Sequence, residues 1–253
     1  MKKFTELVTP FASVAEGGNL PGKDLSWLKT MRDQALAQFN EFGLPSKKVE
    51  NWKYTSLWEL TQQSFNHQAL AVTVSQQECQ GIALLDDAYR VVIIDGVFDA
   101  ELSQLDDLQV GVTIRPFSQS LDTVEQQLGQ QVSMEKVGLT ALNTLLMKEG
   151  VMVHVSAKTM VKKPIELLVI QSGTTDNLAT HLRNMIVLDH HATVTVVEHY
   201  VGLTDVSCFT NVVSEVVLAD NAELFHYKLQ KESKNAIHIA TLAAKQAAGS
   251  QWH

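Results

Sequence analysis

A local cluster of histidines and carboxylates in the second half of the chain has the residue types that suit metal binding. Its members are Asp189, His190, His191, Glu198 and His199. Imidazole nitrogens and carboxylate oxygens are common ligands of iron and zinc. Adjacent side chains of a strand point to opposite faces, so His190 and His191 could share an ion only if a turn rotates one of them. The sequence therefore favours exposed turn imidazoles and polar strand positions over a metal centre, and it leaves the roles of these histidines open.

Three glutamates on the expected strands, Glu198, Glu215 and Glu223, could serve a glycoside-active enzyme, because such enzymes use paired carboxylates. They are not clustered in the sequence, and we expect ordinary solvated carboxylates. His226 and His238 alternate with apolar strand residues, and we expect partly buried or surface strand histidines rather than ligands. These patterns identify no catalytic residue.

The segment 17–24 (GGNLPGKD) nearly matches the phosphate-binding loop of nucleotide hydrolases. Asp24 stands where a Ser or Thr hydroxyl should hold magnesium, Pro21 removes one amide donor, and we expect no strand before the loop. The segment is therefore interpreted as a flexible lead-in and helix cap, and Lys23 is not expected to support ATP hydrolysis. The chain also lacks the Gly-x-Ser-x-Gly, His-Glu-x-x-His and Gly-x-Gly-x-x-Gly patterns.

Cys79 and Cys208 are the only thiols and lie far apart in the sequence. Two isolated cysteines cannot form a disulfide framework, a structural zinc site or an all-cysteine iron–sulfur cluster within one chain. We expect two buried or free thiols in a reducing compartment. An isolated chain is therefore not expected to hold a stable cluster.

Composition and charge exclude further classes of protein. The chain has 253 residues, 45% of them hydrophobic, which is enough for a sizeable core. Its formal charge of −8 disfavours binding to nucleic acid. The purely aliphatic run 167–170 is far shorter than the roughly 20 residues that cross a bilayer. Glu6 and Pro10 interrupt the apolar N-terminal stretch that otherwise hints at a signal peptide, so we expect a cytoplasmic protein without membrane contact.

The first element expected is an amphipathic helix over Asp24–Phe42. Asp24 or Ser26 is predicted to open this helix, and Gly43 and Pro45 are predicted to end it. Its apolar residues recur at spacings of three and four: Trp27, Leu28, Met31, Ala35, Phe39 and Phe42. This spacing predicts one buried face.

Shorter elements follow in the first half of the chain. The sequence predicts a short helix around 52–62 and a strand at Arg90–Ile94 that ends in an Asp95-Gly96 turn. A helix is predicted over Leu139–Lys148 and ends at Gly150. We expect a mostly helical N-terminal domain over residues 1–149.

From Val151 onward the periodicity changes to alternation, which predicts strands and turns over residues 150–253. The segment 187–194 aligns as a repeat with 217–224, and each has a polar turn before an alanine. Strands that recur without intervening helices suit a β-solenoid whose coils stack. An antiparallel sandwich is the alternative that periodicity alone leaves open.

Several stretches resemble SufD, the family of scaffold subunits in the SUF system of iron–sulfur cluster assembly. The first is Glu50–Leu57 (ENWKYTSL), and the others occur in the same order as in that family. They are Val91–Leu102 (VVIIDGVFDAEL), Ala141–Leu168 (ALNTLLMKEGVMVHVSAKTMVKKPIELL), Glu198–Gly202 (EHYVG), Phe225–Ser233 (FHYKLQKES) and His238–Leu242 (HIATL). The resemblance covers nearly the whole chain.

This resemblance implies a helical N-terminal domain followed by a right-handed parallel β-helix. It also implies a non-catalytic scaffold that pairs with a SufB-like subunit through the β-helix and contacts a SufC-like ATPase. Iron, the nascent iron–sulfur cluster and a reduced flavin would belong to the assembled complex, and this chain alone would hold no cofactor. The alternatives are a β-helix interaction module of another pathway and a β-helix enzyme acting on polysaccharide.

Members of the family continue through further coils to a C-terminal helical domain, whereas this sequence stops at Gln251-Trp252-His253. We interpret the chain as truncated, with its β-helix incomplete and its SufC contact region absent. An uncovered last coil would leave Ile237, Ile239 and Leu242 near an open edge. Self-association through that coil and weak binding of the ATPase are therefore expected.

Overall fold

The computed structural model describes residues 19–135 and 137–253. The N-terminal stretch that hints at a signal peptide and the two glycines that open the segment 17–24 lie outside the described residues. Within the described residues, no helix is both long enough and apolar enough to cross a membrane.

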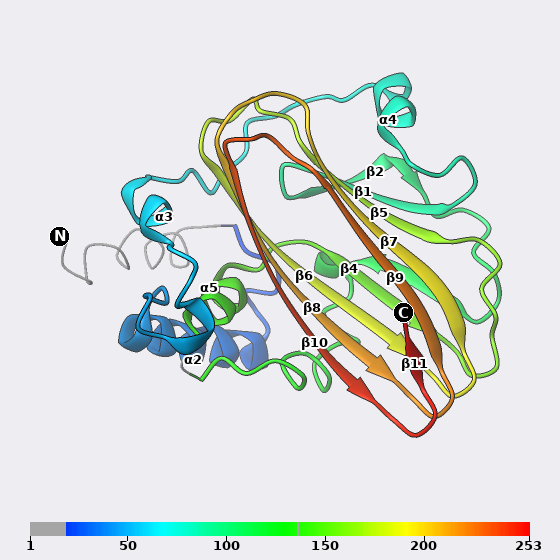
Figure 1. The fold of residues 1–253 in the computed structure, drawn as a ribbon. Helices are drawn as coiled ribbons and strands as arrows, with labels where there is room; N and C mark the ends of the chain where they lie inside the picture. Colours follow the sequence, from blue (N-terminus) through cyan, green and yellow to red (C-terminus); the bar gives the residue numbers. More distant parts are fainter. Residues whose placement is uncertain (1–18, 136) are drawn as a thin grey trace.

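The helical elements of the described chain all precede the solenoid strands that begin at Val151 (Figure 1). They are α2 (Ser26–Phe42), the 3-10 helix η1 (Glu50–Trp52), α3 (Trp58–Gln62), α4 (Gln76–Ile82), the 3-10 helix η2 (Phe117–Gln119) and α5 (Gly138–Leu146). The two long predicted helices are confirmed as α2 and α5, but α5 ends at Leu146 with Met147 as its C-cap residue and does not extend to the predicted end at Gly150. The short helix expected around 52–62 is confirmed over its second half as α3, whereas the start of that range belongs to the separate 3-10 helix η1.

Helix α2 begins at Ser26, but its N-cap residue is Leu25, which makes no side-chain capping bond. The capping role expected for Asp24 or Ser26 is therefore wrong. The predicted end is confirmed, since Gly43 adopts φ 56° and its amide bonds the carbonyl of Phe39. Glycine adopts this combination of φ 56° and ψ −155° without the steric cost that a Cβ would bring, which explains why the helix stops there.

The strands of the described residues form two sheets. One sheet has the order β11-β9-β7-β5-β1-β2 and the other the order β10-β8-β6-β4-β3. Their bounds are β1 (Tyr89–Ile94), β2 (Val97–Gln104), β3 (Val112–Pro116), β4 (Val151–Val155), β5 (Ile165–Gln171), β6 (Leu178–Leu188), β7 (Thr193–Gly202), β8 (Cys208–Leu218), β9 (Glu223–Lys231), β10 (Ala236–Gln246) and β11 (Gln251–Trp252). The strand predicted at Arg90–Ile94 is confirmed as β1.

The chain alternates between the two sheets, so each coil stacks on the preceding coil as a parallel β-solenoid (Figure 1). The register confirms the predicted repeat, because Leu188 pairs with Leu218 and Thr193 pairs with Glu223. Only the first strands pair antiparallel, β1 with β2 and β3 with β4. The antiparallel sandwich is therefore excluded.

Side chains alternate between the two faces of each strand, so the structure has one hydrophobic core inside the solenoid and another between the outer sheet face and the helices. Inward side chains from both sheets fill the solenoid, as Val194, Leu182 and Val212 illustrate. Outward side chains of β6 and β8, such as Phe209, pack with residues of α2 and α5, including Phe39. Figure 1 shows these two helices together on that side of the solenoid. Burying one such Leu or Phe side chain stabilises the fold by about 1.5–3 kcal/mol.

Candidate functional site

The predicted histidine cluster is dispersed in the structure. His190 and His191 lie exposed in the turn between β6 and β7, as expected for turn imidazoles. Asp189 in the same turn lies 3.2 Å from His154 Nε2, on the neighbouring strand β4. His191 has φ 57°, so the turn does rotate one residue, and the His190 and His191 rings meet edge to face with centroids 5.8 Å apart. Across the described parts of the chain, no group of three or more His, Cys, Asp or Glu side chains is placed to hold a metal ion.

Glu198 and His199 occupy opposite faces of β7. The Glu198 carboxylate points into the solenoid, where Oε1 lies 2.9 Å from His226 Nε2 on β9. His199 points outward, and its Nδ1 lies 3.7 Å from Glu166 Oε1. Glu166 in turn accepts a 2.8 Å hydrogen bond from Arg90 Nε. Strand alternation thus separates two residues that are adjacent in sequence.

Glu198 is the centre of a polar network inside the solenoid. Tyr200 donates its hydroxyl proton to Glu198 Oε2 at 2.5 Å. Burial alone would raise the pKa of Glu198, but the hydrogen bond and charge of His226, with the charge of Lys228, lower it below its usual value. Burial and the neighbouring carboxylate raise the pKa of Tyr200 well above its usual value. The network therefore holds an ionised carboxylate in an apolar interior.

A second carboxylate–imidazole pair adjoins the first. His238 Nδ1 on β10 lies 2.7 Å from Glu232 Oε2, and Thr210 donates a 2.8 Å hydrogen bond to the other carboxylate oxygen. The Tyr200 ring meets the His238 ring edge to face, with centroids 4.7 Å apart. Lys228 Nζ lies 4.7 Å from the Tyr200 centroid. Together the two pairs connect β7, β8, β9 and β10.

The carboxylates weighed as enzymatic residues do not converge. Glu215 forms a fully buried ion pair with Arg183, and Glu198 is bonded to His226 and Tyr200. The expectation that these two residues are ordinary solvated carboxylates is therefore wrong. Glu223 remains about one-third exposed and lies 3.4 Å from His253 Nε2. His226 and His238 retain only 5% and 8% side-chain exposure, so they are more buried than expected.

Sequence reasoning missed Arg183, which joins the helical layer to the solenoid. Its Nη2 lies 2.6 Å from Glu215 Oε1. Its Nη1 donates 3.2 Å hydrogen bonds to Asn143 Oδ1 and Thr144 Oγ1 on α5. Glu215 also accepts the amide protons of Gly129 and Gln131 at 2.9 and 3.0 Å. The only feature of the sequence that could have indicated this role is a charged residue at an outward-facing position of β6, a strand that α5 covers.

Both thiols are buried and free, as predicted. Burial, together with the Glu232 and Asp95 charges, raises the pKa of Cys208 to about 12. Burial also raises the pKa of Cys79. Because the thiolate is the metal-binding form, both environments disfavour ligation.

The described part of the phosphate-loop-like segment, residues 19–24, leads into a turn before α2. Gly22 there has φ 68°, and Lys23 and Asp24 are exposed. The residues that precede this loop lie outside the described residues, so the expectation that no strand precedes it stays a prediction. The loop leads directly into α2, and Asp24 stands where a nucleotide-binding loop has a Ser or Thr hydroxyl.

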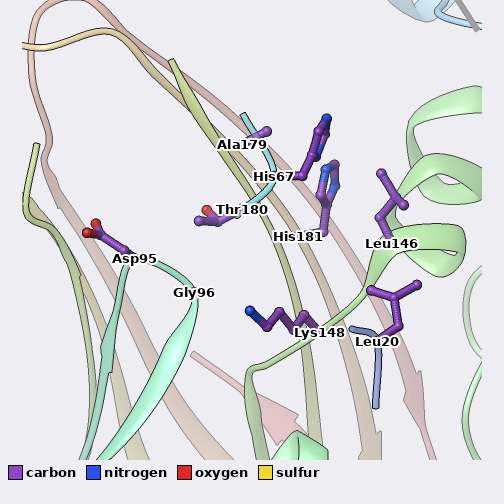
Figure 2. A pocket seen from close by; sticks show the side chains of 9 residues that line it. All are labelled: Leu20, His67, Asp95, Gly96, Leu146, Lys148, Ala179, Thr180 and His181. Atoms are coloured by element: carbon purple, nitrogen blue, oxygen red, sulfur yellow. The ribbon is translucent and has the colours of Figure 1, made fainter. Parts of the chain in front are cut away.

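A small cavity of about 30 Å³ lies where the chain before α4 meets β6 (Figure 2). It contains two imidazoles, His67 and His181, with ring centroids 5.8 Å apart. Lys148 and Asp95 line other parts of the wall. The remaining lining residues are Leu20, Gly96, Leu146, Ala179 and Thr180.

Most of the buried charged and polar side chains described above form hydrogen-bonded pairs, and these pairs connect successive coils or connect the solenoid to the helical layer. Breaking such a pair leaves an uncompensated buried charge, which destabilises the fold. This arrangement suits a rigid scaffold better than a catalytic centre, which needs a nucleophile or acid–base group open to substrate.

Comparison with known protein families matches two consecutive segments of the chain to two family models. Residues 15–167 match the SufBD protein N-terminal region, and residues 170–253 match the SufBD core domain of SUF system FeS cluster assembly. The chain is 27% identical to the iron-sulfur cluster assembly SufBD family protein slr0076 of Synechocystis, over 98% of this chain and 57% of the relative.

Two further relatives are named as iron-sulfur cluster assembly protein SufD. The protein from Escherichia coli is 32% identical over 82% of this chain and 47% of its own length. The protein from Bacillus subtilis is 25% identical over 79% of this chain and 47% of its own length. The chain thus spans about half the length of the curated relatives it matches.

Proposed function

Because this chain belongs to the SufBD family of the SUF system for iron–sulfur cluster assembly, we propose that it is a SufD-type, non-catalytic scaffold subunit of that system. The observation that carries the proposal is the consecutive match of the N-terminal and core models, which together span residues 15–167 and 170–253. The parallel β-solenoid supports it, since stacked coils offer extended faces for protein partners.

Two observations favour a SufD-type role over a SufB-like role. Two of the similar proteins carry the name SufD. In addition, neither thiol is placed to receive sulfur or ligate iron, because Cys79 and Cys208 are buried and burial raises the pKa of both. A subunit that carries the nascent cluster needs accessible thiolate ligands.

The proposed partners are a SufB-like subunit and a SufC-like ATPase. Residues 150–253, which form most of the solenoid, supply the interface with the SufB-like subunit, and residues 1–149, whose strands β1, β2 and β3 extend the two sheets, supply an accessory contact. The iron–sulfur cluster is the cargo of the complex, and iron and a reduced flavin enter at the level of the complex. The proposal places the chain in the cytoplasm, where its two thiols remain reduced.

Co-purification from one expression strain tests this proposal. The tagged chain would be expressed with SufB-like and SufC-like chains of the same organism, and an unrelated ATPase replaces the SufC-like chain in the matched control. We expect the chain to retain the SufB-like subunit more strongly than the ATPase. A second form, extended with the C-terminal half of the Escherichia coli SufD relative, should retain both partners.

Failure of both forms to retain the SufB-like subunit would refute the SUF role. A SufB-like role is distinguished by a second outcome. If the tagged chain instead pairs with a SufD-like chain and takes up a cluster on its own cysteines during anaerobic reconstitution, the SufD-type assignment is wrong.

A further inference from the structure

The tight turn between β1 and β2 consists of Asp95 and Gly96, the only Asp-Gly pair in a sequence that has no Asn-Gly pair. Ile94 pairs with Val97, so these two residues alone connect the strands. Both have a positive φ, 50° at Asp95 and 77° at Gly96. A two-residue hairpin turn with this backbone favours Asp-Gly, because Asp tolerates the left-handed region and Gly adopts it without steric cost.

The same dipeptide is the one in which an aspartate isomerises most readily. The amide nitrogen of the following residue attacks the side-chain carbon Cγ, and a glycine lacks the Cβ that would hinder this attack. The new N–Cγ bond closes a five-membered succinimide, and the amide proton leaves with the carboxyl hydroxyl as water. When water then opens the ring at the main-chain carbonyl, the chain continues through Cβ and Cγ as isoaspartate.

The Asp95 carboxylate is held by Ser172, the residue that follows β5. Oδ1 accepts a 2.8 Å hydrogen bond from the Ser172 amide, and Oδ2 accepts the hydroxyl proton of the same residue. The Asp95 amide donates a 2.9 Å hydrogen bond to the carbonyl of Ile170, and Asp95 is only 4% exposed. The end of β5 therefore fixes both the side chain and the main chain of Asp95.

The glycine side of the turn is packed as well. A Cβ added to Gly96 would lie 3.1 Å from Thr180 Cγ2 on β6. Figure 2 shows the Asp95 carboxylate pointing away from Gly96. Cγ must therefore turn toward the Gly96 nitrogen before the ring can close, and this motion breaks the hydrogen bonds from Ser172.

We propose that Asp95-Gly96 is a latent isomerisation site and that Ser172 keeps it unreacted in the folded chain. Isoaspartate lengthens the main chain by one atom, which a two-residue turn cannot absorb without a change in the register of β1 and β2. Because β1 also pairs with β5, the change would reach the first coil of the solenoid. This inference concerns the chemical lifetime of the chain and does not depend on the proposed SUF role.

Incubation of the full chain at 37 °C and pH 6.5 tests the site. After digestion with trypsin, mass spectrometry with electron-transfer fragmentation measures isoaspartate at position 95 in the peptide 91–115. Synthetic peptides with aspartate and isoaspartate at that position serve as standards. We expect the folded chain to form isoaspartate at least tenfold more slowly than the same chain unfolded in urea.

Three variants test the role of Ser172. Ser172→Ala removes the hydroxyl bond and should isomerise roughly tenfold faster than the unmodified folded chain, since a hydrogen bond to a charged group is lost. Ser172→Thr keeps both donors and should remain slow. Ser233→Ala is the matched control, because this hydroxyl accepts the amide proton of Asn235 in a different turn, and its loss should leave the rate unchanged.

Dilute urea separates local motion of the carboxyl group from unfolding of the whole chain. In Ser172→Ala the rate should stay constant below the unfolding transition, because the carboxyl group turns while the chain remains folded. A rate in Ser172→Ala equal to that of the unmodified chain would refute the role of Ser172, and so would a rate that rises with the first additions of urea. Equal rates in the folded and unfolded unmodified chain would refute the protected site itself.

Discussion

Arg183 and Glu215 face each other across β6 and β8 as a fully buried ion pair, with Nη2 and Oε1 2.6 Å apart. Asn143 and Thr144 hold the guanidinium from α5, and the amides of Gly129 and Gln131 hold the carboxylate. One pair therefore connects two coils, a helix and a loop. The pair contributes to the stability of the fold only when both the guanidinium and the carboxylate are present.

Removing only one partner should strongly destabilise the chain. Arg183→Met leaves a buried, unpaired carboxylate, and such losses cost about 3–5 kcal/mol. The free energy of unfolding from urea titration measures the effect. The double variant Arg183→Met/Glu215→Leu should recover much of the loss, because no charge is left buried.

The matched control for that prediction is Lys163→Ala. Lys163 lies 2.6 Å from Asp87 in an exposed pair, so its loss should change the free energy of unfolding little. Equal effects of Arg183→Met and Lys163→Ala would contradict the role assigned to the buried pair.

Acid should weaken the solenoid through Glu198. Its pKa in the folded chain lies below the usual value, so the carboxylate stabilises the fold above the unfolded-state pKa, and this contribution is lost as the pH falls through the folded-state pKa. We therefore expect the free energy of unfolding to decline below about pH 5. Glu198→Gln should flatten that decline in urea titrations at pH 3–6.

Glu223→Gln is the control for this pH dependence, because the Glu223 side chain is about one-third exposed and only 3.4 Å from the partly exposed His253. It should preserve the acid slope of the unmodified chain. An unchanged slope in Glu198→Gln would show that other groups control acid unfolding.

Gly150 should tolerate no side chain. Its φ of 148° is unfavourable for other residues, and an added Cβ would lie 2.0 Å from the Arg183 carbonyl oxygen. Gly150→Ala should therefore lower the thermal midpoint markedly or prevent folding. Gly81→Ala in α4 is the matched substitution, since no atom lies within 4 Å of its added Cβ, and it should be neutral or stabilising by about 0.5–1 kcal/mol.

The isolated chain should not hold an iron–sulfur cluster. Cys79 and Cys208 are the only thiols, both are buried, and the pKa of Cys208 is raised to about 12. Anaerobic reconstitution with iron and sulfide, followed by visible spectroscopy, is the measurement. A persistent cluster absorption that disappears in Cys79→Ser/Cys208→Ser would prove this expectation wrong.

The sequence by itself determined the repeating architecture and the family. Strand alternation and the repeat of 187–194 at 217–224 predict that Leu188 stacks on Leu218, and the register confirms it. Alternation also separates Glu198 from His199, as the structure shows. These features are readable because side-chain direction and coil length are local and periodic properties of a strand. The resemblance to the SUF scaffold agrees with the matched family models.

Only the tertiary structure decided which polar residues meet. Glu198 contacts His226 and Arg183 contacts Asn143 across long stretches of sequence, and His67 and His181 are separated further still. Their contacts depend on coil stacking and on how the helical layer covers an outward sheet face, and no local pattern encodes that choice. The same reason explains why sequence reasoning wrongly expected a solvated Glu215. A charged residue at an outward strand position is solvated unless another layer covers it, and here α5 and the loop at Gly129 cover the Arg183–Glu215 pair.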